Sequence, residues 1–461
     1  MPFVGECLLA RGGETPRGRV RKSCSKPQSE GVGEEAKGLG RRIFLAGLAS
    51  ALGGGLLGQF GGAPSPPEPE PESSSDDPWE DVRAEFAADP KTVHLAGMLI
   101  ASHPAPVREA IEKHRRGLDE NPARYVLEND TKLRLQAVRA AGRYFGTDPA
   151  CVALTDSTTM GLSVLYRGLS LQDGDEILST THDHYSTWYA LDSVAVRRGV
   201  SLRKISLYDD PASASAEEMA ASLLGAIEPN TRVLALTWVH SDSGLKLPLQ
   251  AIAAGLADLN RTRERPVLLC VDGVHGFGVE NEDMKSLGCD FFVAGCHKWL
   301  YGPRGTGVIY SARPEGWQGM LPLIPPFGVK NTPGLYHSPG GFHAFEHRWA
   351  LSEAFAFHQR IGKAKVEARI HELARQLKEG LSKMPRAKLH TPMEDERSAG
   401  IVAFEFEGHS AEAVVDRLRA KGIVLTQAPY GLRCIRATPC LMNNPEEIER
   451  TLRALHPYGR A

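Results

Sequence analysis

Hydrophobic and polar positions alternate along the middle of the chain in a pattern that predicts a layered α/β fold. Short apolar runs are separated by stretches whose apolar positions recur with helical spacing. The run 266–272 is apolar at nearly every position, as expected for a central parallel strand covered on both faces. The pattern predicts a mostly parallel sheet with helices on both sides. The predicted strands are 151–155, 176–179, 201–206, 232–237, 266–272, 291–294 and 307–310, and the predicted helices are 158–167, 187–198, 216–227 and 249–260.

A second pattern begins after a stretch rich in proline and glycine at 325–341, which indicates a domain boundary. It predicts a smaller α+β domain at 336–461, after a large domain at 91–335 whose N-terminal part could instead join the small domain. The elements predicted for the small domain are a long helical pattern at 345–384, a strand at 400–406, a helix at 410–421, β-type runs around 424 and 432–437, and a closing helix after Pro445.

The first 90 residues lack this alternation and are interpreted as an export signal followed by a linker. The pair Arg41-Arg42 precedes a short apolar stretch that is interrupted by glycines. This resembles a twin-arginine export signal, which we predict over residues 1–63. A membrane anchor and a chance arginine pair are alternatives, and the glycines disfavour a stable anchor helix. Residues 64–90, rich in proline, glutamate and serine, are predicted to be a linker.

Export by the twin-arginine machinery carries proteins that have already folded. We therefore expect a protein of the bacterial periplasm that buries its reduced cysteines before export. If the signal does not function, the protein is expected in the cytoplasm.

Composition narrows the classes of partner. The 461 residues include 54 Lys and Arg and 56 Asp and Glu, for a formal net charge of -2. This balance gives no electrostatic reason to expect nucleic acid as a partner. The 8 cysteines are scattered without zinc-like spacing, so no metal site is predicted.

Lys298 is the first candidate for chemistry. It lies between the apolar run 291–294 and the glycine-rich turn 302–307. A lysine that loses its proton when desolvated can hold a carbonyl compound as a Schiff base. The bare backbone N–H groups of the turn suit an anion such as phosphate. The alternative is a solvated lysine in an ordinary loop.

Three further motifs follow predicted strands, where ligands of parallel sheets gather. Residues 155–161 place three hydroxyl side chains at the start of a helix, which is a phosphate site or an ordinary N-cap. Asp272 ends a buried strand and needs a cationic partner, unless it serves only in an Asp-Gly turn. His184 could cover an aromatic ring, and a metal pair with His182 would need a further ligand that is not evident.

These motifs, in this order, resemble the class V aminotransferase family of fold type I pyridoxal-phosphate enzymes. The resemblance rests on 156–161, Asp183-His184, 271–275 and 295–307, and it extends over about residues 90–455. The chain is most similar to the isopenicillin-N-epimerase-like and cysteine-lyase-like branch. The resemblance implies a large domain with a mostly parallel seven-stranded sheet, a smaller α+β C-terminal domain, and a homodimer.

The resemblance also implies roles around pyridoxal 5'-phosphate. Lys298 would form the internal aldimine, Asp272 would pair with the pyridine N–H, and His184 would stack on the ring. His275 would contact the phenolic oxygen. The groups expected to hold phosphate are Ser157, Thr158, Thr159 and His297, with Thr306 reaching the phosphate of a partner subunit.

Arg436 matches the arginine that binds the substrate carboxylate in the family, since a guanidinium fits a carboxylate with two parallel hydrogen bonds. Without the resemblance, it would be interpreted as a surface arginine on a strand.

Two departures qualify the match. Ser241 stands where many relatives have an asparagine near the cofactor oxygen, which leaves His275 to replace that contact. The loop before Arg436 lacks the reactive cysteine of the desulfurases, and Cys434 lies too close to Arg436 for that role, which disfavours desulfurase chemistry.

The sequence therefore predicts a pyridoxal-phosphate enzyme that acts on an amino acid or related amine. The amine would displace Lys298, which would then remove the α-proton. Transamination, epimerisation and C–S or β-lyase chemistry all start this way, and the motifs do not separate them. The alternative is a non-catalytic exported binding protein that keeps the fold.

Overall fold

A computed structural model describes residues 77–327 and 332–460 of the chain. The predicted twin-arginine signal and most of the predicted linker lie outside the described residues. Within them, no helix combines the length and apolar character needed to cross a membrane.

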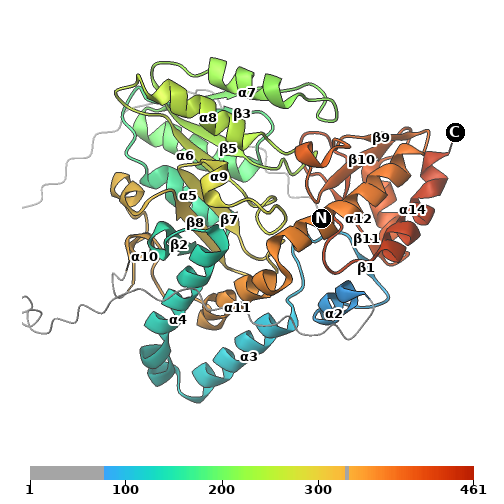
Figure 1. Cartoon of the computed structure of the whole chain (residues 1–461), viewed down its shortest axis with the longest axis horizontal. Coiled ribbons are helices and arrows are strands. Elements are labelled where there is room, and N and C mark those ends of the chain that lie inside the picture. The colour runs from blue at the N-terminus through green and yellow to red at the C-terminus, as the bar shows by residue number, and fades with distance from the viewer. Residues whose placement is uncertain (1–76, 328–331, 461) are drawn as a thin grey trace, which may run out of the picture. The chain divides into compact units, whose positions relative to one another are not determined.

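A seven-stranded sheet forms the centre of the large domain, in the strand order β2-β8-β7-β6-β5-β3-β4 (Figure 1). All neighbours pair in parallel except β8, which is antiparallel to both β2 and β7. This confirms the predicted fold class, and each predicted strand is present within two residues of its expected ends. The strands are β2 (Val152–Thr155), β3 (Glu176–Thr180), β4 (Ser201–Ile205), β5 (Thr231–Thr237), β6 (Leu268–Asp272), β7 (Phe291–Gly295) and β8 (Gly307–Ser311).

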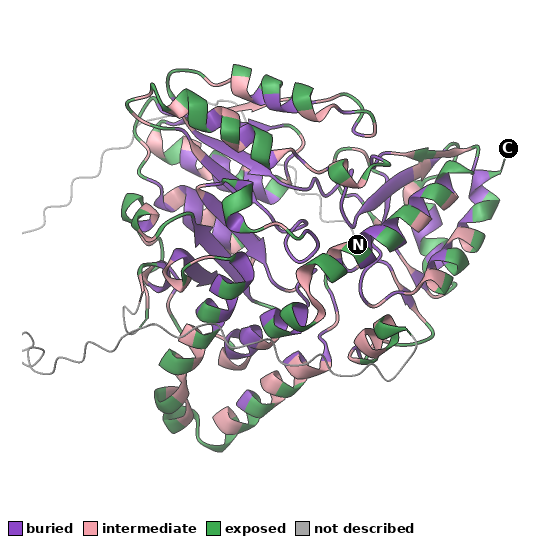
Figure 2. Ribbon diagram, in the orientation of Figure 1, coloured by how far each residue is buried: buried purple, intermediate pink, exposed green. Residues whose placement is uncertain are grey.

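Helices cover both faces of this sheet, and burial follows the layers. Figure 2 shows the strands of the sheet mostly buried, while the covering helices expose their outward sides. Apolar side chains alternate between two core clusters, because successive residues of a strand point to opposite faces. The helices between the strands are α5 (Thr158–Gly168), α6 (Tyr185–Arg198), α7 (Ala216–Gly225), α8 (Leu249–Asn260) and α9 (Met284–Leu287), with 3-10 turns at Pro149–Cys151 and Pro314–Gly319.

Three helices precede the sheet, and the sequence patterns did not predict them. The long helices α3 (Ala105–Glu120) and α4 (Pro122–Phe145) run together and pack against α11 (Phe345–Ile361). The short helix α2 (Pro78–Ala84) lies inside the predicted linker. Phe86, just after it, is buried against Tyr301 with ring centroids 5.0 Å apart. The last part of the predicted linker is therefore folded and packed into the core.

The small domain is built on a four-stranded antiparallel sheet in the order β12-β13-β10-β9. The N-terminal strand β1 pairs in parallel with β11, so residues from before the large domain complete it. Its strands are β1 (Val93–His94), β9 (Ala387–Leu389), β10 (Val402–Phe406), β11 (Ile423–Val424), β12 (Thr426–Gln427) and β13 (Ile435–Ala437). Its helices are α12 (Lys363–Ser382), α13 (Ala411–Arg419) and α14 (Pro445–Gly459), with a 3-10 turn at Asp395–Arg397.

The helical pattern expected at 345–384 is present as two helices, α11 and α12. The break is Gly362, whose φ of 94° lies outside the helical region and is rarely adopted by other residues. Within α12, the buried side chains up to Ile370 belong to the core of the large domain, and those from Leu373 onward belong to the core of the small domain, which also includes Val93 and Leu95. The change of core thus falls within α12, later than the predicted boundary at 335. The short helix α10 (Pro333–Tyr336) also lies against β2.

Candidate active site

Two reactive side chains lie at the carboxyl ends of neighbouring strands. Asp272 is the last residue of β6, and Lys298 follows the end of β7. The two strands pair in parallel, with Asp272 opposite Val293, so the segments that leave them start side by side. The sheet topology thus brings together a lysine and a carboxylate that are 26 positions apart in the sequence.

The environment of Lys298 favours a neutral amine. Burial, and to a lesser extent the Arg436 cation, lower the pKa of Lys298 to about 8, although the Asp272 carboxylate acts in the opposite direction. An amine with that pKa is about 10% neutral at pH 7, whereas an ordinary lysine is neutral in well under ~0.1% of molecules. Lys298 is therefore suited to attack a carbonyl carbon.

His275 faces Lys298 with a defined tautomer. The indole Nε1 of Trp299 donates to His275 Nδ1 at 3.3 Å. An indole N–H can only donate, so the proton of the neutral imidazole lies on Nε2. This Nε2 is 3.4 Å from Lys298 Nζ. Burial and the nearby cations hold the pKa of His275 well below its usual range, so the ring stays neutral. His275 thus presents an N–H donor suited to an oxygen acceptor such as the phenolic oxygen of the predicted cofactor.

Asp272 is a buried carboxyl group with few partners. Its Oδ1 accepts from the Val274 N–H at 3.2 Å, and its Oδ2 accepts a long bond of 3.4 Å from Thr187. Burial raises the pKa of Asp272 to about 6, against the lowering effect of Val274 and Lys298. A cationic N–H on a bound ring would relieve this desolvation and favour the carboxylate. The site therefore fits a protonated pyridine nitrogen.

The predicted phosphate groups converge where β7 ends and α5 begins. Thr158 Oγ1 accepts from the Gly295 N–H at 2.8 Å. A Cβ atom on Gly295 would lie 3.0 Å from both that hydroxyl and the His297 ring, so the two side chains flank one position. His297 Nδ1 is buried and has no hydrogen-bond partner in the part of the chain that the structure describes. An orphaned ring nitrogen beside a hydroxyl and the start of a helix fits a phosphate group.

The other predicted phosphate residues differ in their positions. Ser157 caps α5, since its hydroxyl accepts from the Met160 N–H at 3.1 Å. Thr159 is exposed at the same helix start. Thr306 is buried and donates its hydroxyl proton to the Pro303 carbonyl at 2.5 Å. In this conformation Thr306 has no proton left for a phosphate oxygen, and its contact with a partner subunit stays a prediction.

His184 begins α6 directly after β3 and its following turn. Its Nδ1 accepts from the Ser186 N–H at 3.1 Å, which fixes the ring as an N-cap. Burial, helped by Lys298 and Arg436, lowers the pKa of His184 to about 4, so the ring is neutral. The preceding Asp183 is fully buried and accepts from the Thr237 N–H at 2.6 Å, which ties this turn to β5. By contrast, the His182 ring stacks on the Tyr208 ring, with centroids 3.8 Å apart, and its Nε2 accepts from the Leu207 N–H. These contacts do not pair the ring with that of His184.

Arg436 enters the site from the small domain. It is buried in β13 and donates to the Ser241 carbonyl at 2.8 Å, to the Gln427 carbonyl at 3.0 Å and to the Thr426 hydroxyl at 3.2 Å. None of these partners is an anion, and no ion pair of Arg436 occurs within the described residues. A buried guanidinium without a counter-ion fits the carboxylate of a substrate.

Tyr430 is a site residue that the sequence did not single out. It lies in the loop between β12 and β13, and its hydroxyl forms a hydrogen bond with Ser241 Oγ. Its ring meets the His184 ring edge to face, with centroids 5.4 Å apart. Ser241, which stands where many relatives have an asparagine near the cofactor oxygen, thus contacts Tyr430. Only the antiparallel pairing of β12 with β13 places this tyrosine over the site, and no motif signals it.

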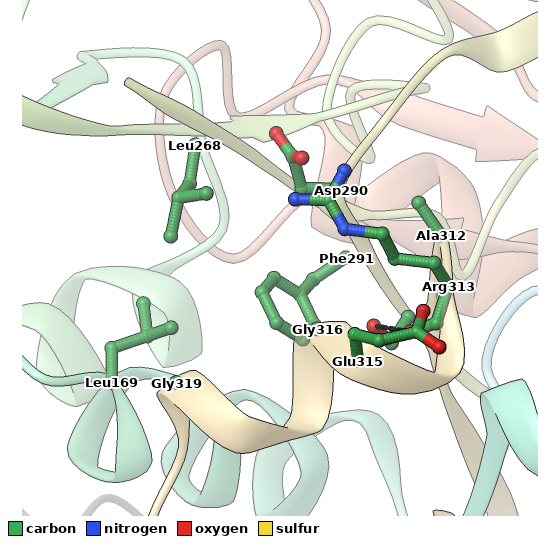
Figure 3. A pocket seen from close by; sticks show the side chains of 10 residues that line it. Leu169, Leu268, Asp290, Phe291, Ala312, Arg313, Glu315, Gly316 and Gly319 are labelled. Carbon is green, nitrogen blue, oxygen red and sulfur yellow. Dashed lines mark hydrogen bonds between the residues drawn. The ribbon is translucent and has the colours of Figure 1, made fainter. Parts of the chain in front are cut away.

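A pocket of about 200 Å³ at the opposite edge of the sheet holds none of these residues (Figure 3). It is lined by the starts of β6 and β7, including Leu268, Asp290 and Phe291, and by Arg313. Ligands of parallel sheets bind outside the carboxyl ends of strands, where Lys298 and Asp272 lie. The pocket in Figure 3 is therefore separate from the candidate active site.

Comparison with known proteins agrees with this geometry. The family model for class V aminotransferases matches residues 101–455. The chain belongs to the class V aminotransferase family. Isopenicillin N epimerase of Streptomyces clavuligerus is 28% identical over 397 residues, which cover 82% of this chain and 97% of that protein. A cysteine desulfurase of Serratia proteamaculans is 28% identical over 331 residues, 66% of this chain and 77% of that protein.

Among solved structures, a C-DES mutant with glycine covalently linked to its PLP cofactor superposes with a TM-score of 0.75. The two sequences are 25% identical, and the match covers 82% of this chain and 99% of the C-DES chain. C-DES is also described as a cystine C–S lyase, in complex with its product cysteine persulfide, at a TM-score of 0.73. These matches confirm the predicted family, fold, cofactor and enzymatic nature, and they disfavour the alternative of a non-catalytic binding protein.

The comparisons do not bear out the expectation that desulfurase chemistry is disfavoured, since several desulfurases match the chain. The loop of Tyr430 still contains no cysteine. Cys434 is buried and directs its thiol to the Asp242 carbonyl at 3.1 Å. Burial also raises the pKa of this thiol to about 12, which leaves it protonated.

Proposed function

We propose that this protein removes the α-proton of an amino acid, or of a similar amine that carries a carboxylate, with pyridoxal phosphate as cofactor. The observation that carries the proposal is the pairing of a lysine of lowered pKa with a buried guanidinium that makes no ion pair among the described residues. Lysine chemistry of this kind requires a substrate with an amino group, and Arg436 would bind the carboxylate of that substrate.

When bound, the cofactor supplies an electron sink for the pair of electrons left at the α-carbon. Arg436 holds the carboxylate through its two remaining N–H directions and thereby orients the α-carbon. The neutral amine of Lys298 accepts the α-proton. Asp272 would hold a protonated pyridine nitrogen through a charged hydrogen bond, and the Nε2–H group of His275 would donate a hydrogen bond to the phenolic oxygen. His184 would lie against the ring and exclude water from it.

Epimerisation is favoured over desulfurase chemistry. Two epimerases match the chain over 97% and 99% of their own length, whereas desulfurases of similar identity match over 72% to 94% of theirs. The buried thiol of Cys434 supports the same preference, because a persulfide route needs an accessible thiolate.

The decisive experiment measures visible absorption and amino-acid turnover of the purified protein. With pyridoxal phosphate, the wild type should show the absorption band of a lysine–cofactor imine, and Lys298→Ala should lack it. Lys246→Ala is a matched control, since Lys246 is engaged by Glu280 outside the site. A panel of amino acids assayed for keto acid, inverted enantiomer and released leaving group would separate the three reactions. A wild type without the band after cofactor is supplied would refute the proposal.

The proposal includes a homodimer. Large apolar side chains are exposed at Leu321, Phe327 and Phe342, and the last two rings lie 5.2 Å apart. The turn that carries Thr306 is near this surface, since the His347 ring donates to the Arg304 carbonyl at 2.8 Å. Apolar exposure of this kind is typical of an interface. Sedimentation should give a dimer that Phe342→Asp weakens, and a wild type that sediments as a monomer would count against it.

Export by the twin-arginine machinery to the periplasm is also proposed, on the basis of Arg41-Arg42 and the apolar stretch after them. Replacing both arginines by lysine should retain the protein in the cytoplasm of a bacterial host, as measured by cell fractionation. Equal amounts of the wild type and the variant outside the cytoplasm would refute export by this route.

A further inference from the structure

Tyr430 has the position and the contacts of a second proton-transfer group. Its ring is half-buried and meets three aromatic neighbours edge-on, namely His184 at 5.4 Å, Tyr185 at 5.8 Å and Trp188 at 6.4 Å. Such edge-to-face contacts fix the orientation of a ring. They also leave the hydroxyl free to point elsewhere, and it points to Ser241 Oγ.

Ser241 connects this hydroxyl to the carboxylate-binding residue. The Ser241 carbonyl accepts from Arg436 Nη1 at 2.8 Å, while the Ser241 hydroxyl meets Tyr430. One residue therefore touches both the guanidinium and the phenol. The α-carbon of a substrate is a single bond away from the carboxylate that Arg436 would hold. The Tyr430 hydroxyl is thus linked through Ser241 to the group that would hold this end of the substrate.

Lys298 and Tyr430 approach this position from different parts of the molecule. Lys298 comes from the end of β7 in the large sheet, with its amine beside His275. Tyr430 comes from the small domain and lies against the imidazole of His184. If His184 covers one face of the cofactor ring, Tyr430 lies on the covered side, and Lys298 reaches the substrate from the sheet side.

The loop of Tyr430 is built to hold this position. Gly431 has a φ of 59°, a left-handed conformation that favours glycine. A Cβ atom there would lie 2.6 Å from Asp242 Oδ2, so the backbone passes close to the buried Asp242. Burial also keeps the pKa of the Tyr430 phenol above its usual value, so the hydroxyl carries its proton at neutral pH.

We propose that Tyr430 is the catalytic acid that delivers a proton to the substrate α-carbon on the face opposite Lys298, so that the enzyme inverts the α-carbon. The inference rests on the proposed function. Lys298 takes the α-proton, and the electron pair of the broken C–H bond stays with the substrate and cofactor. The O–H bond of Tyr430 then breaks, and its proton forms the new C–H bond. The resulting Tyr430 phenolate and Lys298 ammonium return to their starting states by proton exchange with water.

The test uses the holoenzyme in deuterated water with the L- and D-enantiomers of the proteinogenic amino acids. NMR follows α-proton exchange, and chiral chromatography follows inversion. For the wild type we expect inversion in which the product gains deuterium while the remaining substrate keeps its α-proton early in the reaction. This asymmetry requires two separate groups and is not produced by a purely structural role.

Tyr430→Phe keeps the three ring contacts and removes only the hydroxyl. We expect its cofactor absorption to be unchanged and inversion to fall by about 10²- to 10⁴-fold, the usual contribution of an acid or base. Exchange without inversion should persist for the enantiomer whose α-proton faces Lys298. Tyr189→Phe is the matched control, since Tyr189 is 71% exposed on the helix that His184 caps, and it should behave as wild type.

Each outcome decides the question. A parallel fall of exchange and inversion in Tyr430→Phe, or no change in either, would overturn the role of Tyr430. Exchange without inversion in the wild type would overturn this inference and the preference for epimerisation, and would leave the proposed removal of the α-proton intact. A wild type that binds the cofactor but exchanges no α-proton from any amino acid would overturn the proposed function itself.

Discussion

The two halves of the active site are built differently. The cofactor half, with Lys298, Asp272 and His275, is placed by the ends of central strands in a seven-stranded sheet. The substrate half, with Arg436 and Tyr430, is placed by a three-residue strand and the loop before it. Sites on strands are held more rigidly than sites on loops. The proposed cofactor contacts are thus fixed by the core of the fold, while the loop of Tyr430 is the part of the substrate half that can vary most.

This contrast agrees with the relatives of the chain. Epimerases and cysteine desulfurases match it at similar identity, although their names describe different reactions. A shared scaffold with different chemistry is common, because function depends on a small set of side chains grafted on the fold. In this protein the loop that carries Tyr430 is one place where such a difference would arise.

The largest expected effect comes from the cofactor half. Asp272→Asn removes the charge that keeps the pyridine nitrogen protonated, and it should lower turnover by about 10²- to 10³-fold, as does the loss of other preorganised electrostatic groups. The cofactor should still bind, since Lys298 is intact, and absorption spectra would show it. Asp290→Asn is the control, because Asp290 is a half-buried carboxyl at the opposite edge of the sheet. Equal losses in both variants would mean that the effect is structural.

A smaller and more selective effect is expected in the substrate half. Arg436→Lys keeps the charge but loses the paired N–H geometry. This should raise KM for carboxylate-bearing substrates by about 10- to 100-fold, the usual contribution of one charged hydrogen bond to binding. The absorption of the bound cofactor and kcat should change little. Arg433→Lys, on the exposed part of the same segment, should match the wild type. If Arg436→Lys abolished cofactor binding, the division into two halves would be wrong.

The smallest expected effect concerns pH and again separates the halves. Because burial lowers the pKa of Lys298 to about 8, raising the pH from 7 to 8 increases its neutral fraction. The rate of imine formation by the apoenzyme should therefore rise about fivefold and then level off near pH 9. Stopped-flow absorption measures this rate, and Nα-acetyllysine corrects for ionisation of the cofactor. A rate that climbed about tenfold per pH unit up to pH 10 would indicate an ordinary lysine.

The rate of imine formation should also fall in acid. Asp272 has a pKa of about 6, and its protonation would remove the anionic partner of the pyridine nitrogen. Arg436→Lys should shift neither the acidic nor the basic limb of this pH–rate profile by much, since Arg436 has only a minor effect on the pKa of Lys298.

The sequence by itself determined the large sheet and most of the cofactor half. Apolar runs such as 266–272 identified the buried strands, and glycine, hydroxyl and lysine motifs stood directly after them. Strand ends can be predicted because the hydrophobic period and the turn residues are local signals. Once parallel strands are assigned, their carboxyl ends must lie at one edge. The amino-acid sequence was therefore enough to place Lys298, Asp272 and the start of α5 together.

Only the tertiary structure decided the rest. The break at Gly362, the folded segment around Phe86 and the contact of Tyr430 with His184 depend on packing between segments far apart in the chain. The tautomer of His275 depends on the hydrogen bond from the Trp299 indole. Arg436 makes no ion pair among the described residues, because the groups that β12 and the segment after β5 bring to it are uncharged. Local periodicity carries no record of such long-range contacts, because many sequences with the same pattern would meet different neighbours. The sequence thus determined where the candidate lysine lies, and the packing of the small domain decided which side chains surround the proposed substrate position.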